Sequence, residues 1–268
     1  MKKIIKSIIP PILVNLYLKY YTKKYGWHGE YNTWEDAKNV SSGYDSEKII
    51  QKVRNSALKV KNGLANYERD SVIFQNIQYC WPLLAGLMFA SATNKIGLKV
   101  LDFGGSLGTT YFQNKKFLKH LSHFSWSIVE QKKFVDIGKM DFEDTNLKFY
   151  YDIKSCIEYE NPNVLLLSSV LEYIDKPFEL LDELLINNFE FVLVDRTPFS
   201  KNKKKIKLQT VDPKIYEASY PCWFFNEIEF VKYFENKNYR IVESYETVGG
   251  NTNEYVFKGF IIRKIYKN

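Results

Sequence analysis

Short apolar runs alternate with amphipathic stretches through the second part of the chain. Residues 98–102, 125–130, 147–151, 163–168 and 189–195 each read as a buried strand. The segments between them carry apolar residues at helical spacing, and this alternation is typical of βαβ units in a parallel sheet. We therefore expect an α/β fold.

The end of the chain predicts a helix followed by a β-hairpin. Asn226 is suited to cap that helix, because Glu229 follows three residues later. Residues 239–247 and 254–264 then read as two strands, and they predict an antiparallel pair at the edge of the sheet.

The first 96 residues predict mainly helices. Thr33 is a helix cap, and Asp45 or Ser46 starts a second helix. A third helix is expected from Ser71 to about Ala92, with a kink at Pro82.

We accordingly divide the chain into an N-terminal helical cap, residues 1–96, and an α/β domain, residues 97–268. A long connection, residues 197–225, interrupts the α/β pattern. Long connections in compact domains are often lids or binding loops, so we expect this one to border a ligand site.

Composition indicates an ordinary globular protein. The chain has 268 residues, of which 45% are hydrophobic and 16% aromatic, which is ample for a packed core. The net charge of +7 suits anionic partners, although compositional drift explains it equally well. Three widely spaced cysteines form neither a disulfide framework nor a metal motif, so we expect no metal and a reduced, cytoplasmic location.

The N-terminal segment admits two interpretations. Lysines 2, 3 and 6 precede the apolar run from Ile8 to Leu18, but Pro10 and Pro11 break it and no cleavage site follows, which argues against a signal peptide. One alternative is a peripheral contact with the inner face of an anionic membrane. The other is a helix packed on its own domain.

A glycine-rich turn follows the first predicted strand of the α/β domain. Residues 99–108 read Lys-Val-Leu-Asp-Phe-Gly-Gly-Ser-Leu-Gly. Glycines at such a turn let the backbone approach a ligand closely, and the turn after the first strand is the usual cradle in open α/β sheets. The alternative is a simple helix start.

This turn resembles motif I of class I S-adenosylmethionine-dependent methyltransferases. Asp102, Gly104 and Gly108 occupy its first, third and seventh places, while Ser106 takes the place of the middle glycine. In this interpretation Gly105 supplies the freedom that Ser106 lacks. The resemblance implies a Rossmann-like sheet, mostly parallel with an antiparallel last strand, and S-adenosylmethionine as cofactor.

Further cofactor residues follow from the same resemblance. Glu130, with Gln131 after it, ends the second strand where the superfamily holds the ribose hydroxyls. Ser168 ends the fourth strand. Asp152 stands where superfamily members place an acid against the adenine amine, and its alternative is a surface turn residue.

The sequence from about Trp27 to about Tyr245 is similar to a family of methyltransferases encoded among bacterial surface-polysaccharide genes. Tyr-Glu-Arg-Asp-Ser at 67–71 and Asp-Arg-Thr-Pro at 195–198 belong to this likeness. It implies a small-molecule or lipid-linked glycan as acceptor.

Two carboxylates are candidates for catalysis. A sugar hydroxyl needs a general base, whereas a phosphate or carboxylate acceptor does not. Asp195 and Glu172 follow the fifth and fourth strands and are the candidate bases. Their alternatives are an ion pair between Asp195 and Arg196 and a helix cap by Glu172.

Substrate binding is assigned to a polar and aromatic group of residues. The candidates are Arg196, Tyr216, Tyr220 and Trp223, since aromatic rings beside a ligand edge suit sugar faces. Alternatively, these rings pack within the protein. His28 is a further candidate acid or base in the cap.

The function we expect is oxygen methylation of a sugar or glycan precursor in cell-surface polysaccharide synthesis. A nucleic-acid methyltransferase is a rival, but residues 168–171 lack the Asn/Asp-Pro-Pro-aromatic signature of amino-methylating enzymes. A non-catalytic, membrane-associated protein with a cofactor fold is another. A dehydrogenase is disfavoured by the terminal hairpin. The oligomeric state stays open.

Overall fold

The computed structural model describes residues 24–43 and 47–266. They fold into two compact units, one from the described residues of 1–44 with 205–222, and one from 47–204 with 223–266. The sequence-based division between residues 96 and 97 separates cap from α/β domain, and it stays a prediction.

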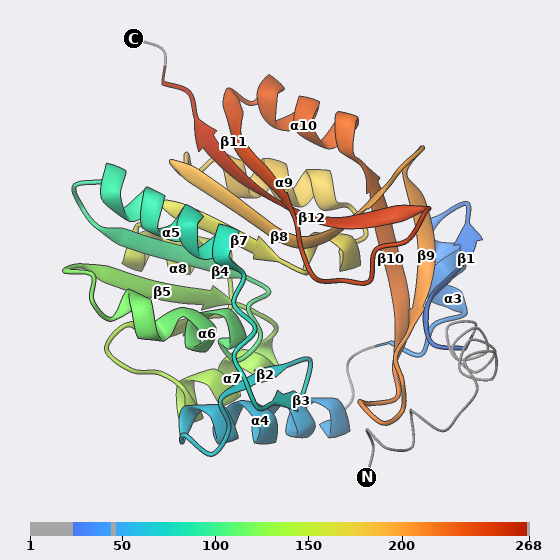
Figure 1. Ribbon diagram of the computed structural model, residues 1–268, viewed down its shortest axis with the longest axis horizontal. Helices are drawn as coiled ribbons and strands as arrows, with labels where there is room; N and C mark the ends of the chain where they lie inside the picture. The colour runs from blue at the N-terminus through green and yellow to red at the C-terminus, as the bar shows by residue number, and fades with distance from the viewer. Residues whose placement is uncertain (1–23, 44–46, 267–268) are drawn as a thin grey trace, which may run out of the picture. The chain divides into compact units, whose positions relative to one another are not determined.

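The larger unit is built on a twisted, mostly parallel sheet (Figure 1). Its strands are β4 (Leu98–Phe103), β5 (Phe124–Val129), β6 (Leu147–Tyr150), β7 (Val164–Ser168), β8 (Phe191–Ser200), β11 (Tyr239–Glu246) and β12 (Tyr255–Lys264). They lie in the order β6-β5-β4-β7-β8-β12-β11. All pair in parallel except β12, which runs antiparallel to β8 and β11. This confirms the predicted fold class.

Helices cover both faces of this sheet. Those of the larger unit are α4 (Glu47–Lys61), α5 (Trp81–Thr93), α6 (Thr109–Leu118), α7 (Lys132–Asp141), α8 (Ile153–Glu160), α9 (Pro177–Leu185) and α10 (Glu227–Asn236), with the short 3-10 helix η1 (Leu171–Tyr173). Side chains alternate along each strand. Val192 and Val194 pack with α9 and α10, whereas Leu193 lies against α5 at Gly86. Trp126 likewise lies on the α6 face, beside Tyr111.

The terminal elements follow the predicted pattern closely. The side chain of Asn226 accepts a hydrogen bond of 3.0 Å from the backbone N–H of Glu229, which caps α10. The strands β11 and β12 then pair antiparallel, with Tyr239 opposite Lys264. The cap and the hairpin are both confirmed.

The predicted helix from Ser71 to Ala92 is wrong in its first half. Residues 67–74 form a hairpin of β2 (Tyr67–Arg69) and β3 (Val72–Phe74). Its two turn residues, Asp70 and Ser71, have φ of 51° and 65°, the left-handed conformation that a tight hairpin turn requires. Pro82 does not kink the helix but stands in its first turn, where proline is tolerated.

The predicted long loop at 197–225 is also wrong, because most of it is strand. The strand β8 continues to Ser200, and β9 (Lys205–Thr210) and β10 (Ser219–Asn226) follow. At the end of β10, Phe225 and Asn226 pair in parallel with Phe199 and Ser200 of β8.

The smaller unit is a β-rich module with one short described helix. The strand β1 (Gly26–Tyr31) pairs antiparallel with β9, so the N-terminal region is less helical than predicted. The helix α3 (Trp34–Asn39) begins after Thr33 with a reciprocal capping box to Asp36, as the sequence indicates.

Two predictions lie outside the described residues. These are the apolar run from Ile8 to Leu18, with its possible membrane contact, and the helix cap at Asp45 or Ser46. Within the described residues, every helix is too short or too polar to cross a bilayer.

Candidate functional site

The strand order reverses between β4 and β7, and the glycine turn lies at this point. The chain leaves β4 toward β5 on one side, while β7 pairs with the other side of β4. In open α/β sheets, ligands bind outside the carboxyl ends of the strands at such a reversal. The loops after β4, β5, β7 and β8 are therefore the candidate site.

Backbone conformation in the glycine turn accounts for its composition. Gly104, Ser106 and Gly108 have φ of 70°, 52° and 92°, a region that non-glycine residues seldom adopt. Gly105 has no such φ, so it does not supply the freedom that Ser106 lacks; Ser106 adopts the left-handed conformation itself. The turn needs Gly105 for space, because a Cβ there would stand 2.5 Å from Oδ2 of Asp102.

The carboxyl of Asp102 packs directly against the glycine turn. Its side chain is 1% exposed, and Oδ2 accepts a hydrogen bond of 3.0 Å from the indole of Trp126. Oδ1 is buried and has no partner among the described residues. Burial raises the pKa of this carboxyl to about 7.

Glu130 links the turn to the neighbouring strand. Its Oε2 accepts a hydrogen bond of 2.6 Å from the backbone N–H of Gln131, and the backbone N–H of Ser106 also donates to this carboxylate. Burial raises its pKa, which these two donors partly oppose. The carboxylates of Asp102 and Glu130 therefore flank the turn, as predicted; Gln131 contributes its backbone.

Asp152 is occupied as a helix cap. Its two carboxylate oxygens accept from the backbone N–H and the hydroxyl of Ser155, at 2.8 and 2.9 Å. These hydrogen bonds lower its pKa, and the residue is exposed. The geometry favours the turn alternative, and a contact with adenine stays a prediction.

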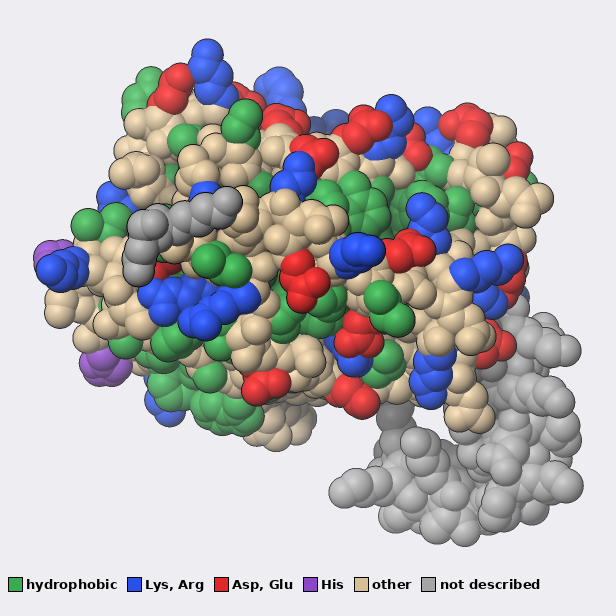
Figure 2. Space-filling model, turned by 90° about the horizontal axis from the view of Figure 1, so that it is seen from above, with side chains coloured by type: hydrophobic (Ala, Val, Ile, Leu, Met, Phe, Trp, Pro, Cys, Tyr) green, Lys and Arg blue, Asp and Glu red, His purple; other side chains and the backbone are tan. Residues whose placement is uncertain are grey.

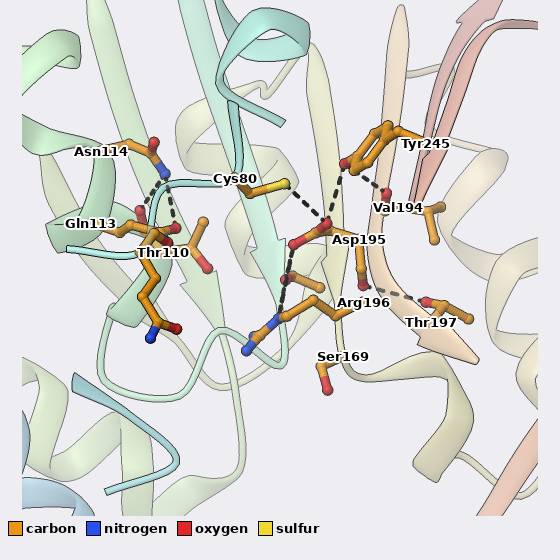
Figure 3. A network of polar contacts seen from close by, with 12 residues as sticks. Cys80, Thr110, Gln113, Asn114, Ser169, Val194, Asp195, Arg196, Thr197 and Tyr245 are labelled. Atoms are coloured by element: carbon orange, nitrogen blue, oxygen red, sulfur yellow. Dashed lines mark hydrogen bonds and ion pairs between the residues drawn. The ribbon is translucent and has the colours of Figure 1, made fainter. Parts of the chain in front are cut away.

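A cavity of about 290 Å³ opens at the same edge of the sheet, and we call it the carboxyl-edge cavity. It is lined by Tyr67 and Arg69 of β2, residues 78–82, the first turns of α6, the ends of β7 and β8, and residues 246–251. Three predicted site residues, Ser168, Asp195 and Arg196, meet in its wall; Figure 3 shows Asp195 and Arg196.

Asp195 lies at the centre of a polar network. Its Oδ1 accepts from the thiol of Cys80 at 3.4 Å and from the hydroxyl of Tyr245 at 3.2 Å. Its Oδ2 accepts from the hydroxyl of Ser168 at 3.4 Å and lies 3.8 Å from Nε of Arg196. Figure 3 shows Cys80, Tyr245 and Arg196 converging on this carboxylate.

Arg196 has an unusual backbone and a nearly buried side chain. Its φ is 51°, which is a strained backbone conformation for a residue other than glycine. Such a conformation persists only where the surrounding structure holds it in place, which is often at functional sites. Attraction to Asp70 and Asp195 raises its pKa against the opposing effect of burial. The guanidinium is thus a fixed positive charge in the wall of the cavity.

Glu172 is buried in η1 and is not part of the cavity lining. Its Oε1 accepts from the hydroxyl of Ser169 at 3.2 Å, and its Oε2 has no partner among the described residues. Burial raises its pKa to about 8, so at neutral pH the carboxyl is mostly protonated. Its role as a base stays a prediction, and the geometry does not favour it.

The predicted aromatic residues fall into different units. The indole of Trp223 donates to the backbone oxygens of Ile174 and Asp175, at 3.0 and 3.2 Å, and the ring packs on the apolar core. Tyr216 and Tyr220 belong to the smaller unit, as does His28, whose Nε2 lies 3.2 Å from the hydroxyl of Thr210. Substrate binding by the two tyrosines stays a prediction.

Sequence reasoning missed Cys80, Tyr245 and Glu68. Cys80 and Tyr245 contact Asp195 from residues far away in the chain. Glu68 is 3% exposed and accepts from the hydroxyl of Thr109, at the start of α6. Only Glu68 could have been found from the sequence, because it belongs to the Tyr-Glu-Arg-Asp-Ser segment at 67–71 that is part of the family likeness.

The charged surface is mixed. Figure 2 shows basic and acidic side chains interspersed over one face, with one compact group of Lys and Arg. Across its described residues, this face lacks the continuous basic stripe that follows a nucleic-acid backbone.

No protein-family model matches the sequence, and neither does any curated protein. The fold is similar to solved structures. The N-terminal domain of EvdMO1, in the presence of SAH and D-fucose, superposes with a TM-score of 0.50 and 12% identity, over 83% of this chain and 98% of that one.

Two further structures resemble the chain more weakly. They are the glycopeptide N-methyltransferase MtfA complexed with S-adenosyl-L-methionine, with a TM-score of 0.48 and 9% identity over 68% and 94% of the two chains, and 1,6-didemethyltoxoflavin-N1-methyltransferase of Burkholderia thailandensis, at 0.45 and 14% over 84% and 93%.

Proposed function

We propose that the chain is an S-adenosylmethionine-dependent methyltransferase that methylates an oxygen of a sugar or glycan precursor in surface-polysaccharide synthesis. We place it in the cytoplasm, with contact to the inner face of the membrane as a further possibility for its N-terminal segment. Likeness to solved structures supports the fold, and the residues at the carboxyl edge support the activity.

The groups around the glycine turn suit this cofactor. S-adenosylmethionine carries a cationic sulfonium, an ammonium and a carboxylate, and its ribose offers two hydroxyls. Asp102 places a buried carboxyl under the turn, where its negative charge favours a cation, Glu130 is a carboxylate directly after β5, and the first N–H groups of α6 follow Gly108. Helix N-termini favour anions, so each part of the cofactor finds a complementary group.

The carboxyl-edge cavity suits a small polar acceptor beside that cofactor. When bound, S-adenosylmethionine supplies an activated methyl group. This chain has to hold the acceptor in line with it and keep water out, because positioning provides most of the rate in such displacements. Polar groups of Gln113, Ser168 and Arg196 line the cavity, together with the rings of Tyr79 and Trp81.

An aromatic platform supports a ring-shaped acceptor. Trp81 is 59% exposed, although large aromatic side chains are usually well buried. Its ring centroid lies 4.8 Å from that of Tyr79 and 5.8 Å from that of Phe117. An exposed indole beside a polar cavity offers a flat face to a sugar or nucleobase.

The strongest support for the proposal is the position of the cavity next to the glycine turn. The cavity and the glycine turn meet at α6, since Gly108 caps that helix and Thr109 and Thr110 of its first turn line the cavity. A cofactor on the turn would therefore lie beside an acceptor in the cavity.

Calorimetry with S-adenosylmethionine and S-adenosylhomocysteine tests the cofactor half. We expect saturable binding of both, and loss of binding in Glu130→Ala with the circular dichroism spectrum unchanged. Glu158→Ala is the control and should bind both normally, since Glu158 is an exposed carboxylate of α8 with no assigned role. Folded protein that binds neither compound at millimolar concentration would end the proposal.

Label transfer tests the acceptor half. The protein is incubated with methyl-labelled cofactor and a panel of cell-envelope sugar nucleotides and glycolipids, and products are separated and counted. We expect label in a saccharide. Label in RNA or DNA, with affinity falling steeply as salt rises, would move the protein to the rival class.

A further inference from the structure

The guanidinium of Arg196 has hydrogen-bond donors to spare in the carboxyl-edge cavity. Within the described residues, its contacts run through Nε, to the hydroxyl of Ser168 at 3.4 Å and to Asp195 at 3.8 Å. The two terminal nitrogens have no acceptor there. Figure 3 shows them extending away from Asp195, toward the side on which Thr110 and Gln113 lie.

The two terminal nitrogens of Arg196 form a fork, and its surroundings limit its movement. The side chain of Arg196 is 19% exposed and that of Asp195 4%, so the pair is largely shielded from water. A guanidinium presents its terminal N–H groups in the geometry of a carboxylate or phosphate, and such bidentate bonds are short and strong. An unpaired fork in a cavity wall is suited to bind an oxyanion.

Several acidic groups act on this charge. Asp70, Asp195 and Glu172 act on Arg196, and Glu68 is also within electrostatic range. Burial raises the pKa of Glu172 to about 8, so its carboxyl is mostly protonated at neutral pH, and burial raises the pKa of Glu68 as well. A cationic sulfonium beside the cavity would further favour an anionic acceptor.

Among the described lining residues, the groups that could act as a base toward a neutral hydroxyl already accept hydrogen bonds or stay protonated. Asp195 already accepts from Cys80, Tyr245 and Ser168. The other carboxylate in the lining, Glu246, is exposed and accepts from Asn251. Burial and Asp195 raise the pKa of Cys80 to about 12, so its thiol stays protonated, and no histidine is among the described lining residues.

We propose that the methyl-accepting oxygen belongs to an oxyanion of the acceptor, a carboxylate or a phosphate on a saccharide, and that Arg196 holds this group. The inference rests on the proposed function and names its substrate class. Asp195 is then a positioning residue that fixes Arg196.

The chemistry balances without a base. A lone pair on the oxyanion forms the new O–C bond while the bond from the methyl carbon to sulfur breaks. The electron pair of that bond stays on sulfur, which gives S-adenosylhomocysteine. The acceptor loses one negative charge, the sulfonium its positive charge, and no proton is released. A hydroxyl acceptor would instead release one proton for each methyl transferred.

Binding of simple probes tests the inference without turnover. Protein saturated with S-adenosylhomocysteine is titrated with glucuronate, glucose 1-phosphate and glucose, after binding of that product has been measured by itself. We expect at least one charged sugar to bind about tenfold more tightly than glucose, as a hydrogen-bonded charge pair should give. Arg196→Gln should remove this preference.

Lys119→Gln is the matched control, because Lys119 is an exposed cation just after the opposite end of α6. It should keep the preference. Equal binding of all three sugars, binding of none, or an unchanged preference in Arg196→Gln would each overturn the inference. Failure to bind S-adenosylhomocysteine would instead overturn the proposed function.

The labelled product identifies the oxyanion. A methyl ester of a carboxylate releases its label as methanol in mild alkali, whereas a methyl phosphodiester is stable and shows coupling of the methyl protons to phosphorus. Either product supports the inference. A methyl ether formed with release of one proton would refute it and leave the proposed function standing.

Discussion

The indole N–H of Trp126 donates a hydrogen bond of 3.0 Å to Oδ2 of Asp102, across the neighbouring strands β5 and β4. This bond holds a carboxyl that is almost fully buried under Gly105. The other oxygen, Oδ1, has no partner among the described residues. The glycine turn therefore rests on a carboxyl that is satisfied on one side only.

Replacing Trp126 with Phe should destabilise the protein by about 1–3 kcal/mol beyond the packing loss, because Oδ2 of Asp102 would stay buried without its donor. Chemical denaturation followed by circular dichroism measures the free energy of unfolding. Asp102→Asn and the double variant complete a double-mutant cycle. Strictly additive effects would show that the bond contributes nothing.

Cofactor affinity should depend on pH through Asp102. Its pKa of about 7 means that the carboxyl gains most of its charge between about pH 6 and 8, while the sulfonium of the cofactor keeps its positive charge. A cation prefers the ionised form, so affinity should rise with pH, with a loss of about tenfold at one unit below that pKa.

Calorimetry at several pH values measures this dependence. Asp102→Asn should bind more weakly and show a flatter profile, since it removes the carboxyl that titrates in this range. A flat profile in the unaltered protein over this range would contradict the assignment.

The elements with local signals were predictable. The central strands β7 and β8 are apolar runs that are buried on both faces, so their pattern depends on the sheet alone. Asn226 and Thr33 cap helices through residues three positions away. Asp102 and Glu130 were predictable as candidate site carboxylates because each lies at the carboxyl end of a strand. Asp102 is the last residue but one of β4, and Glu130 directly follows β5.

The elements and residues that the sequence did not predict depend on contacts between residues far apart in the chain. The β2–β3 hairpin turns on Asp70 and Ser71, which lack the usual Asn-Gly signature. Strand β9 pairs with β1, about 180 residues away along the chain, as the 182-residue separation between Trp27 and Gln209 shows. Cys80 joins Asp195 across 115 residues. Periodicity within a segment cannot reveal such partners.

A matched pair of glycines separates backbone strain from steric clash. Gly104 and Gly63 have φ of 70° and 71°, but a Cβ at Gly104 would stand 2.4 Å from Val170, whereas one at Gly63 meets nothing within 4 Å. Gly63→Ala should cost about 1 kcal/mol of stability. Gly104→Ala should cost a further 1–3 kcal/mol, approximately, and abolish cofactor binding.

Denaturation and calorimetry on both variants check this difference. Val170→Ala in the Gly104→Ala background should recover part of the lost stability, because it removes the methyl group that the new Cβ meets. Equal costs at the two glycines, or normal cofactor binding by Gly104→Ala, would show that the turn is not packed as described.

Asp195→Asn should affect the acceptor more than the cofactor. Asn keeps a side-chain oxygen for Tyr245 and Cys80 but weakens the ion pair with Arg196. We expect the KM for the acceptor to rise about tenfold, at the scale of one charged hydrogen bond, with the affinity for S-adenosylmethionine unchanged. Steady-state kinetics distinguishes this from a general base, whose loss would lower kcat by about 100-fold or more.

Glu172→Gln should make stability less sensitive to pH. The carboxyl has a pKa of about 8 in the folded chain against an ordinary value of 4.5, so the folded chain binds a proton that the unfolded chain releases between these values. The free energy of unfolding therefore falls as pH rises from about 4.5 to 8, by at most about 5 kcal/mol, and levels off above.

The variant lacks this proton, so its advantage over the unaltered protein should grow with pH across that window. Denaturation at pH 5, 6.5 and 8 measures the two curves. Glu158→Gln, on the exposed side of α8, is the control and should run parallel to the unaltered protein, because its carboxyl is solvated in both states. If Glu172→Gln also ran parallel, the carboxyl would be ionised in the folded chain. Glu172 would then become a competent base at neutral pH, and loss of turnover in the same variant would establish that role.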